Sequence, residues 1–222
     1  MKKIFLLLLI FCLSIYSQTN ESNANSYRSI NGEKLEPAWV YIGEAKRAIK
    51  NGDTSYALYL MNKTIMYYPD NADAHYYLAV IYEKEAGEPA EQGGAASYRL
   101  AIEEYKKAIQ LNKNLNVPAY KLDAYFSLLH IYEKLIDEEN YAITEKEIIN
   151  MAENGMNRLE RGRIYFKLAE LYDNRNRNSS AIDFYRQSYL NGYRQKLSLF
   201  RISIIYRKAR NYTQEKEYLI LA

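Results

Sequence analysis

The sequence has little of the chemistry from which most catalytic and metal-binding sites are built. Its 222 residues include one cysteine, Cys12, and two histidines, His75 and His130. It has no His-Glu-x-x-His motif, no Gly-x-Ser-x-Gly motif and no phosphate-binding glycine loop, because Gly93-Gly94 is not followed by Lys-Ser or Lys-Thr. An active site needs a nucleophile with its base, or a metal cluster. The sequence therefore argues against an enzyme and predicts no catalytic residue, no metal and no cofactor.

The single cysteine lies inside an N-terminal apolar run. Two lysines precede this run, which covers residues 4–13, and small polar residues follow it. This order predicts a signal peptide over residues 1–17, cleaved after Ser17, and an exported protein that is periplasmic or secreted. A retained anchor is the alternative, but the run is shorter than the roughly 20 residues of a spanning helix. Lipidation of Cys12 is not expected, because a lipoprotein signal places a small residue before the cysteine and this chain has Phe11.

The chain that remains after cleavage has no cysteine and almost no net charge. Without disulfides, an exported protein must be stabilised by its core alone. The 28 basic and 27 acidic residues that remain leave a charge of +1, which excludes the strongly basic surface of a nucleic-acid binder or a polybasic membrane-surface protein. We expect no strong membrane binding after cleavage. Residues 18–37 are rich in Asn and Ser and predict a flexible linker.

A short apolar pattern recurs along the rest of the chain. In the stretch from Tyr165 to Tyr185 it reads Tyr-x2-Leu-Ala-x2-Tyr, then a run of Asn, Arg and Ser, then Ala-x3-Tyr. Copies of the first cluster end at positions 48, 82, 132, 172 and 206, with spacings of 34, 50, 40 and 34 residues. The second cluster recurs at Ala57, Ala101 and Ala181. Because apolar residues fall at i, i+3, i+4 and i+7, each cluster predicts a helix, and the chain predicts five helical hairpins.

The paired clusters resemble the tetratricopeptide repeat, whose 34-residue unit reads Trp-x2-Leu-Gly-x2-Tyr, then Ala-x3-Phe, then Pro. The resemblance covers residues 38–222. It implies an all-α fold, an α-solenoid of about five hairpins that form a right-handed superhelix. The expected repeats are about 38–71, 72–115, 122–155, 162–195 and 196–222.

Four places depart from the repeat pattern. Residues 85–97 look like an insertion between the two helices of the second copy, and the second helix of the third copy has no clean Ala-x3-aromatic cluster. The last copy has Glu215-x3-Leu219 where Ala-x3-Phe is expected. His75 replaces the first aromatic of its copy, so we expect it to be a structural histidine.

In this family the first helices of the hairpins line a concave groove that holds peptides or helices of partner proteins. Carried over to matching positions, the resemblance implies a partner-binding groove lined by Ile42, Lys46, Tyr76, Phe126, His130, Phe166, Glu170, Phe200 and Ile204. Four of these residues are aromatic, namely Tyr76, Phe126, Phe166 and Phe200. If their rings are exposed in the groove, they predict a partly apolar partner. The alternative is that the rings pack in the core. Some family members clamp a terminal carboxylate with Lys and Asn, but here the Asn partners are absent, so no such clamp is predicted.

The function predicted from these observations is that of a non-catalytic scaffold or adaptor in the cell envelope, which binds components of an envelope complex. The alternative is a transport-accessory protein that binds a small ligand or a solute receptor, with the insertion at 85–97 as a partial lid. The apolar C-terminal helix suggests a docking surface and a possible homo-oligomer, because solenoids normally end in a polar cap.

Overall fold

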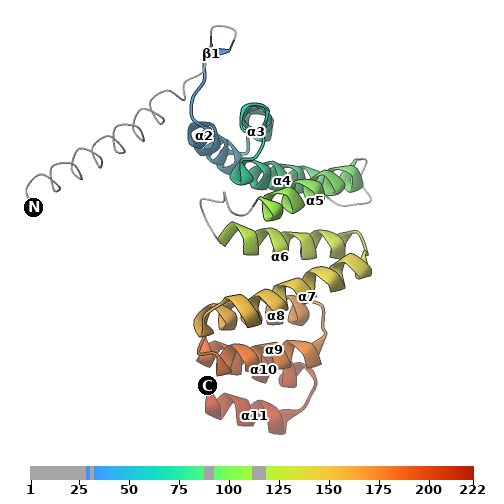
Figure 1. Ribbon diagram of the computed structural model, residues 1–222. Helices are drawn as coiled ribbons and strands as arrows, with labels where there is room; N and C mark the ends of the chain where they lie inside the picture. Colours follow the sequence, from blue (N-terminus) through green and yellow to red (C-terminus); the bar gives the residue numbers. More distant parts are fainter. Residues whose placement is uncertain (1–28, 31–32, 88–92, 112–118) are drawn as a thin grey trace, which may run out of the picture. The chain divides into compact units, whose positions relative to one another are not determined.

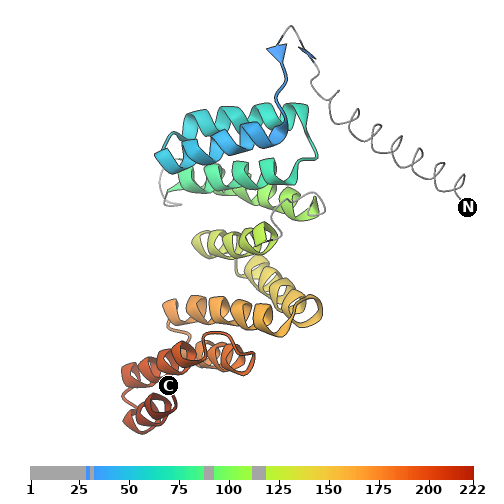
Figure 2. The ribbon, with the colours of Figure 1, turned by 90° about the vertical axis from the view of Figure 1, so that its left-hand side faces the viewer.

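The computed structural model describes residues 29–30, 33–87, 93–111 and 119–222. The chain divides into two compact units, residues 1–135 and residues 136–222. Figure 1 gives the order of the elements and Figure 2 shows the ribbon turned by 90°. Among the described residues, every element is an α-helix except one β-ladder of two residues per strand. The predicted all-α class is confirmed.

In its described residues, the first unit has five helices. They are α2 (Ala38–Asn51), α3 (Thr54–Tyr67), α4 (Ala72–Ala86), α5 (Gly94–Gln110) and α6 (Ala119–Lys134). Helix α2 packs along α3, and α4 packs along α5, which gives two hairpins within the predicted ranges 38–71 and 72–115. Helix α6 packs against α4 and α5.

The second unit, described throughout, also has five helices. They are α7 (Glu138–Gly155), α8 (Arg158–Asn174), α9 (Asn178–Leu190), α10 (Gln195–Lys208) and α11 (Tyr212–Leu221). Helices α8 and α9 form one hairpin, α10 and α11 form another, and α9 packs against α10 between them, as the orange and red ribbons of Figure 1 show. Helix α7 packs against α8. The predicted third repeat, 122–155, takes α6 from one unit and α7 from the other, and its pairing stays a prediction.

Helix α7 begins and packs without the expected cluster. Its buried residues are Tyr141, Thr144, Ile148 and Ala152, spaced three or four apart. Tyr141-x3-Glu145 thus stands where the repeat has Ala-x3-aromatic, and the buried stripe continues through Thr144 and Ile148. The apolar stripe is kept although the residue types have changed, which explains why the sequence signal was weak here.

The small residues of the repeat lie in the helix contacts, as the pattern predicted. All seven are at most 1% exposed, namely Ala45, Ala57, Ala79, Ala101, Ala169, Ala181 and Ser203. Each unit has a core built around them. In the first unit this core includes Leu60, Met61 and Ile81, and in the second it includes Phe166, Tyr185 and Ile202. Burial of such side chains contributes roughly 1.5–3 kcal/mol each.

Left-handed residues recur at one place in the repeat. Gly52, Ile136, Asn176 and Arg210 have φ of 85°, 58°, 55° and 57°. Each lies four residues after the end of a first cluster, in the turn before the second helix of its repeat. The next helix then begins at a capping residue, and three of these caps are side-chain acceptors: Asp53, Asp137 and Asn211. The turns are therefore alike in backbone although their residues differ.

Two predicted boundaries differ from the structure. The run of Asn, Arg and Ser over residues 174–180 separates two clusters in the sequence, which predicts a turn between two helices. The structure has a shorter turn, because α8 ends at Asn174 and α9 already begins at Asn178. Asn and Ser are well tolerated in the first turn of a helix. The insertion over residues 85–97 is helical at both ends, and the Tyr98 hydroxyl donates to the Gly87 carbonyl at 2.7 Å. Residues 88–92 of the insertion lie outside the described residues.

The predicted signal peptide, residues 1–17, lies outside the described residues. In the predicted linker, the two-residue strands β1 (Ser29–Ile30) and β2 (Glu33–Lys34) pair antiparallel. The sequence between them is Asn-Gly, the dipeptide that most favours a two-residue hairpin. Just before α2, the Glu36 amide donates to the Tyr41 hydroxyl, and the Tyr68 hydroxyl donates to the Glu36 carbonyl, both at 3.1 Å. The end of this segment is therefore fixed to the first hairpin.

Candidate functional site

Two side-chain contacts link α8 with α10 or the turn before it; α8 and α10 are the first helices of the two hairpins in the second unit. The Arg194 guanidinium lies 5.2 Å from the centroid of the Phe166 ring. About two to three turns further on, Lys208 Nζ lies 3.2 Å from Asp173 Oδ1. We call the surface between these contacts the α8–α10 face. Its residues are Arg163, Phe166, Glu170 and Asp173 on α8, Arg194 in the turn before α10, and Phe200, Arg201, Ile204 and Lys208 on α10.

Phe166 forms the floor of this face and is not available to a partner. Its side chain is 2% exposed and packs edge-on against Tyr185 and Tyr193, with ring centroids 5.3 and 5.8 Å away. Phe166 is therefore a core residue, as the alternative interpretation of the aromatic positions predicted. Phe200 is 45% exposed, and Ile204 one turn later is partly buried. The apolar contact surface on this face is therefore carried by Phe200 and Ile204.

The α8–α10 face has an excess of positive charge. Arg163 is exposed and makes no hydrogen bond or ion pair within the described residues. Arg201 is half-buried, and its Nε has no hydrogen-bond partner. Glu170 is half-buried and opposes these charges, whereas Asp173 is paired with Lys208. The four basic and two acidic side chains leave a surface that favours an acidic ligand.

Beneath this face, Tyr185 has a hydroxyl without a partner. Its side chain is fully buried, and its oxygen makes no hydrogen bond to any residue that the structure describes. Burial raises the pKa of this hydroxyl, the Asp173 carboxylate raises it further, and Arg201 acts in the opposite direction. The hydroxyl therefore stays neutral at ordinary pH.

The first unit contains the same tyrosine with its hydroxyl satisfied. Tyr105 and Tyr185 each end an Ala-x3-Tyr cluster, and Glu83 and Asp173 each follow the last tyrosine of a first cluster. The Tyr105 hydroxyl donates to Glu83 Oε2 at 2.6 Å. In the second unit the equivalent acid is one methylene shorter and is bonded to Lys208 instead. Of these two tyrosines, Tyr105 has an acceptor for its hydroxyl, whereas Tyr185 has none among the described residues.

The corresponding residues of the first unit are more involved in packing. Ile42 is buried in the first core, and Lys46 lies over the Tyr77 ring at 5.5 Å. Tyr76 packs edge-on against Tyr105 with centroids 5.8 Å apart. On α6, Phe126 is half-buried and His130 is exposed. Of the nine residues predicted for the groove, Ile42 and Phe166 are core residues, and partner binding by the others stays a prediction.

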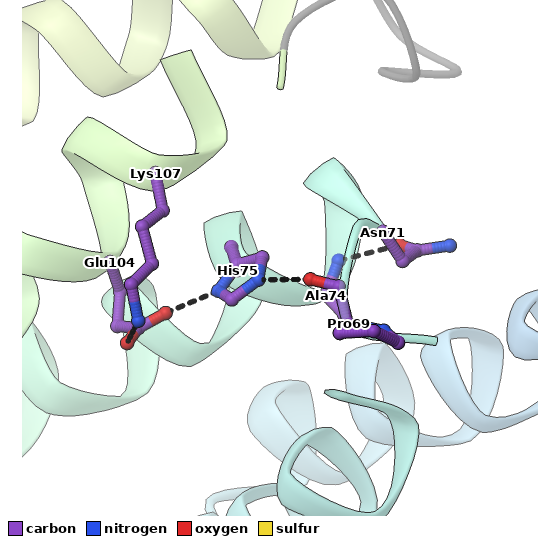
Figure 3. A network of polar contacts seen from close by, with 6 residues as sticks. All are labelled: Pro69, Asn71, Ala74, His75, Glu104 and Lys107. Carbon is purple, nitrogen blue, oxygen red and sulfur yellow. Dashed lines mark hydrogen bonds and ion pairs between the residues drawn. The ribbon is translucent and has the colours of Figure 1, made fainter. Parts of the chain in front are cut away.

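His75 holds the first unit's second hairpin together through a polar network (Figure 3). It is 4% exposed; Nε2 lies 2.8 Å from the Pro69 carbonyl oxygen, and Nδ1 is bonded to the Glu104 carboxylate. Lys107 donates to the other oxygen of that carboxylate at 3.1 Å. Burial by itself would lower the pKa of His75, but the bonds to Glu104 and Pro69 outweigh it and raise the pKa. The predicted structural role of His75 fits these contacts.

Sequence reasoning missed the residues that distinguish the two units. Tyr185 and Tyr105 were recognised only as pattern positions, and Asp173 was not assigned to the groove. Arg201 was considered only as part of a carboxylate clamp, which was not predicted because the Asn partners are absent. A comparison of equivalent positions between repeats would have paired Glu83 with Asp173. Among the described residues, no group of three or more His, Cys, Asp or Glu side chains could hold a metal ion. No helix in the described part is long and apolar enough to cross a membrane.

No protein-family model and no curated protein sequence matches the chain. Solved structures do match. Pseudomonas aeruginosa PilF aligns with a TM-score of 0.54 and 20% identity, over 82% of this chain and 72% of PilF. MamA of Desulfovibrio magneticus RS-1 aligns with a TM-score of 0.53 and 12% identity, over 82% of this chain and 91% of MamA. Both are tetratricopeptide-repeat proteins.

The chain has the tetratricopeptide-repeat fold. Human IFIT1, solved as a dimer with PPP-AAAA, has the same fold, with a TM-score of 0.55 and 17% identity over 82% of this chain. The chain spans 47% of the length of IFIT1. At these identities the likeness shows the fold alone. Tetratricopeptide-repeat proteins generally mediate protein–protein interaction, and the scaffold proteins with this fold are typically non-catalytic.

Proposed function

We propose that this protein is a non-catalytic scaffold or adaptor, which binds segments of partner proteins on the first helices of its repeats. The observation that carries the proposal is the α8–α10 face. It presents an exposed aromatic ring, Phe200, together with the exposed Arg163 and the half-buried Arg201. Aromatic and arginine side chains are the residues in which binding energy concentrates at protein interfaces.

The proposed place of action is the cell envelope or the space outside it. The support comes from residues 1–17, with two lysines, a short apolar run and a small-residue cleavage site. We expect the processed protein to begin at Gln18. N-terminal sequencing of the protein isolated from its own organism tests this, and an intact Met1 in a cytosolic fraction contradicts it.

Photo-crosslinking tests the binding face. A photoreactive phenylalanine is placed at Phe200 or at His130, both exposed on first helices, in the full chain in its own organism. The control positions are Tyr59 and Tyr189, which are exposed on the second helices α3 and α9. We expect envelope proteins to be captured from Phe200 and His130 but not from the controls. Equal capture from all four positions, or no capture, argues against the proposal.

A further inference from the structure

We propose that two copies of this protein associate through the outer face of α11, with the two helices side by side and parallel. The inference goes beyond the proposed function and does not depend on it. The surface is formed by Thr213, Lys216, Glu217, Ile220 and Leu221, and we call it the α11 outer face. Its proposed occupant is the same face of a second copy.

The opposite side of α11 is occupied by contacts within the second unit. The Tyr218 ring stacks on Tyr206 with centroids 5.6 Å apart, and its hydroxyl accepts from Nε and Nη2 of Arg186 at 3.0 and 2.7 Å. Arg207 Nε donates to Glu215 Oε1 at 2.6 Å. These contacts hold α11 on α9 and α10, so its place in the fold does not depend on the outer face.

The α11 outer face is apolar where the other second helices are polar. Ile220 and Leu221 are 75% and 60% exposed, and they stand five and six residues after Glu215, which begins the second cluster of the last repeat. At the same two positions, the other second helices of the described chain have Asn62 and Lys63 on α3, Lys106 and Lys107 on α5, Lys146 and Glu147 on α7, and Arg186 and Gln187 on α9. Two adjacent apolar side chains at a place that is otherwise polar indicate a contact surface.

The charges of the α11 outer face fit a second copy. Helical geometry places Thr213 and Ile220 along its middle, with Lys216 on one side and Glu217 on the other. In two parallel helices related by a twofold axis, Ile220 faces Ile220 of the second copy, and Lys216 of each copy lies beside Glu217 of the other. An antiparallel pair would bring like charges together. Lys216 is exposed and makes no ion pair within the described residues, so it is available for this contact.

The size of the surface sets the strength of the association. Helix α11 has 10 residues, and a helix of this length is about 15 Å long. Such a contact lies at the small end of specific interfaces, so we expect a weak dimer with a dissociation constant of about 10–100 μM. Because salt screens exposed charges, the dimer should weaken as the ionic strength rises.

Sedimentation equilibrium of the full chain, purified from its own organism, tests the association over concentrations below and above this constant. The double variant Ile220→Arg, Leu221→Gln gives α11 the two residues that α9 has, and it should associate at least about tenfold more weakly. Met66→Arg is the matched control, because Met66 is 76% exposed on α3, and it should associate as the parent does. The melting temperature of both variants in dilute solution should equal that of the parent, because neither change touches a buried residue.

Reversal of the charges tests the parallel arrangement. Lys216→Glu and Glu217→Lys each place like charges across the twofold axis and should weaken the association about threefold to tenfold. The double variant restores both ion pairs with their signs exchanged, so its association should return to that of the parent. On oxidation, Ile220→Cys should form a disulfide between copies, because the two positions face each other, whereas Met66→Cys should not.

Four results would overturn the inference. They are a parent that stays monomeric at the highest concentration, an Ile220→Arg, Leu221→Gln variant that associates as the parent does, a double charge reversal that does not recover, and Met66→Cys that crosslinks as readily as Ile220→Cys. The proposed function is tested separately. If the dimer forms while photo-crosslinking from Phe200 and His130 captures no partner, this inference stands and the proposed function fails.

Discussion

Nε2 of His75 lies 2.8 Å from the carbonyl oxygen of Pro69. The other ring nitrogen is bonded to the carboxylate of Glu104. Both partners are acceptors, so only the protonated imidazole, which has two N–H donors, satisfies both at once. Neutral His75 has one donor and would leave one of these bonds unmade.

Stability should therefore depend on pH through this network. The pKa of folded His75 is raised above its ordinary value of 6.5. Its contribution is complete below pH 6.5 and is lost as the pH rises through the folded pKa. Burial would raise the pKa of Glu104, but His75 and Lys107 outweigh it and lower the pKa, so its contribution is present above 4.5 and lost as the pH falls through the folded value. Melting temperatures measured from acidic to alkaline pH should be highest between these limits.

The variant His75→Gln should lose the decline above pH 6.5 and be about 1–3 kcal/mol less stable at mildly acidic pH. His130→Gln is the matched control, because His130 is exposed and makes no contact of this kind. If His75→Gln keeps the pH profile of the parent, His75 does not control it.

Tyr105→Phe and Tyr185→Phe should affect stability differently. The first removes the hydrogen bond to Glu83 and should cost about 0.5–2 kcal/mol. The second removes a buried hydroxyl that has no partner, so the free energy of unfolding should stay the same or rise. Urea unfolding of both variants measures the difference, and equal losses would contradict the unpaired state of Tyr185.

Gly162→Ala should destabilise the second unit although alanine favours helices. A Cβ at this position would lie 2.8 Å from Cβ of Tyr193 and 3.0 Å from Cβ of Asn191. We expect a loss of about 1–3 kcal/mol from overpacking. Gly43→Ala is the control in α2, where nothing lies within 4 Å of the added Cβ, and it should gain up to about 1 kcal/mol. Thermal unfolding that ranks the two variants in the opposite order would show that this contact can relax.

The variants Phe166→Ser and Phe200→Ser distinguish the buried ring of the α8–α10 face from its exposed ring. Phe166 is 2% exposed, and its loss should cost at least about 3 kcal/mol. Phe200 is 45% exposed, and its loss should cost about 1 kcal/mol or less while partner capture falls. Circular dichroism on heating measures the first effect and crosslinking the second. A marked loss of stability in Phe200→Ser would make it a core residue.

The hairpins could be predicted because their signal is periodic. Small residues such as Ala169 and Ala181 mark where helices meet, and the structure buries both completely. The burial of the aromatic residues could not be predicted. Helical spacing shows on which side of the helix a residue lies, but not which other residues cover it. Phe166 and Phe200 hold the same place in their repeats, yet Phe166 is covered by Tyr193 and Arg194 from the turn before α10. A cover of this kind depends on tertiary contacts that a single helix pattern does not contain.

The α8–α10 face shows a second limit. Asp173 and Glu83 are both acids and read alike in a pattern of charges. Only the geometry shows that one bonds a tyrosine and the other a lysine.

The recurring left-handed turn shows that the repeats keep one backbone conformation although their residue types differ. The same backbone conformation is held by Gly52, Ile136, Asn176 and Arg210, four residues with nothing else in common. Glycine adopts it freely, whereas a β-branched residue such as isoleucine adopts it rarely. What the repeats share at this position is therefore the path of the chain and not a side chain. The backbone conformation of a repeat can therefore stay the same where its residue types differ.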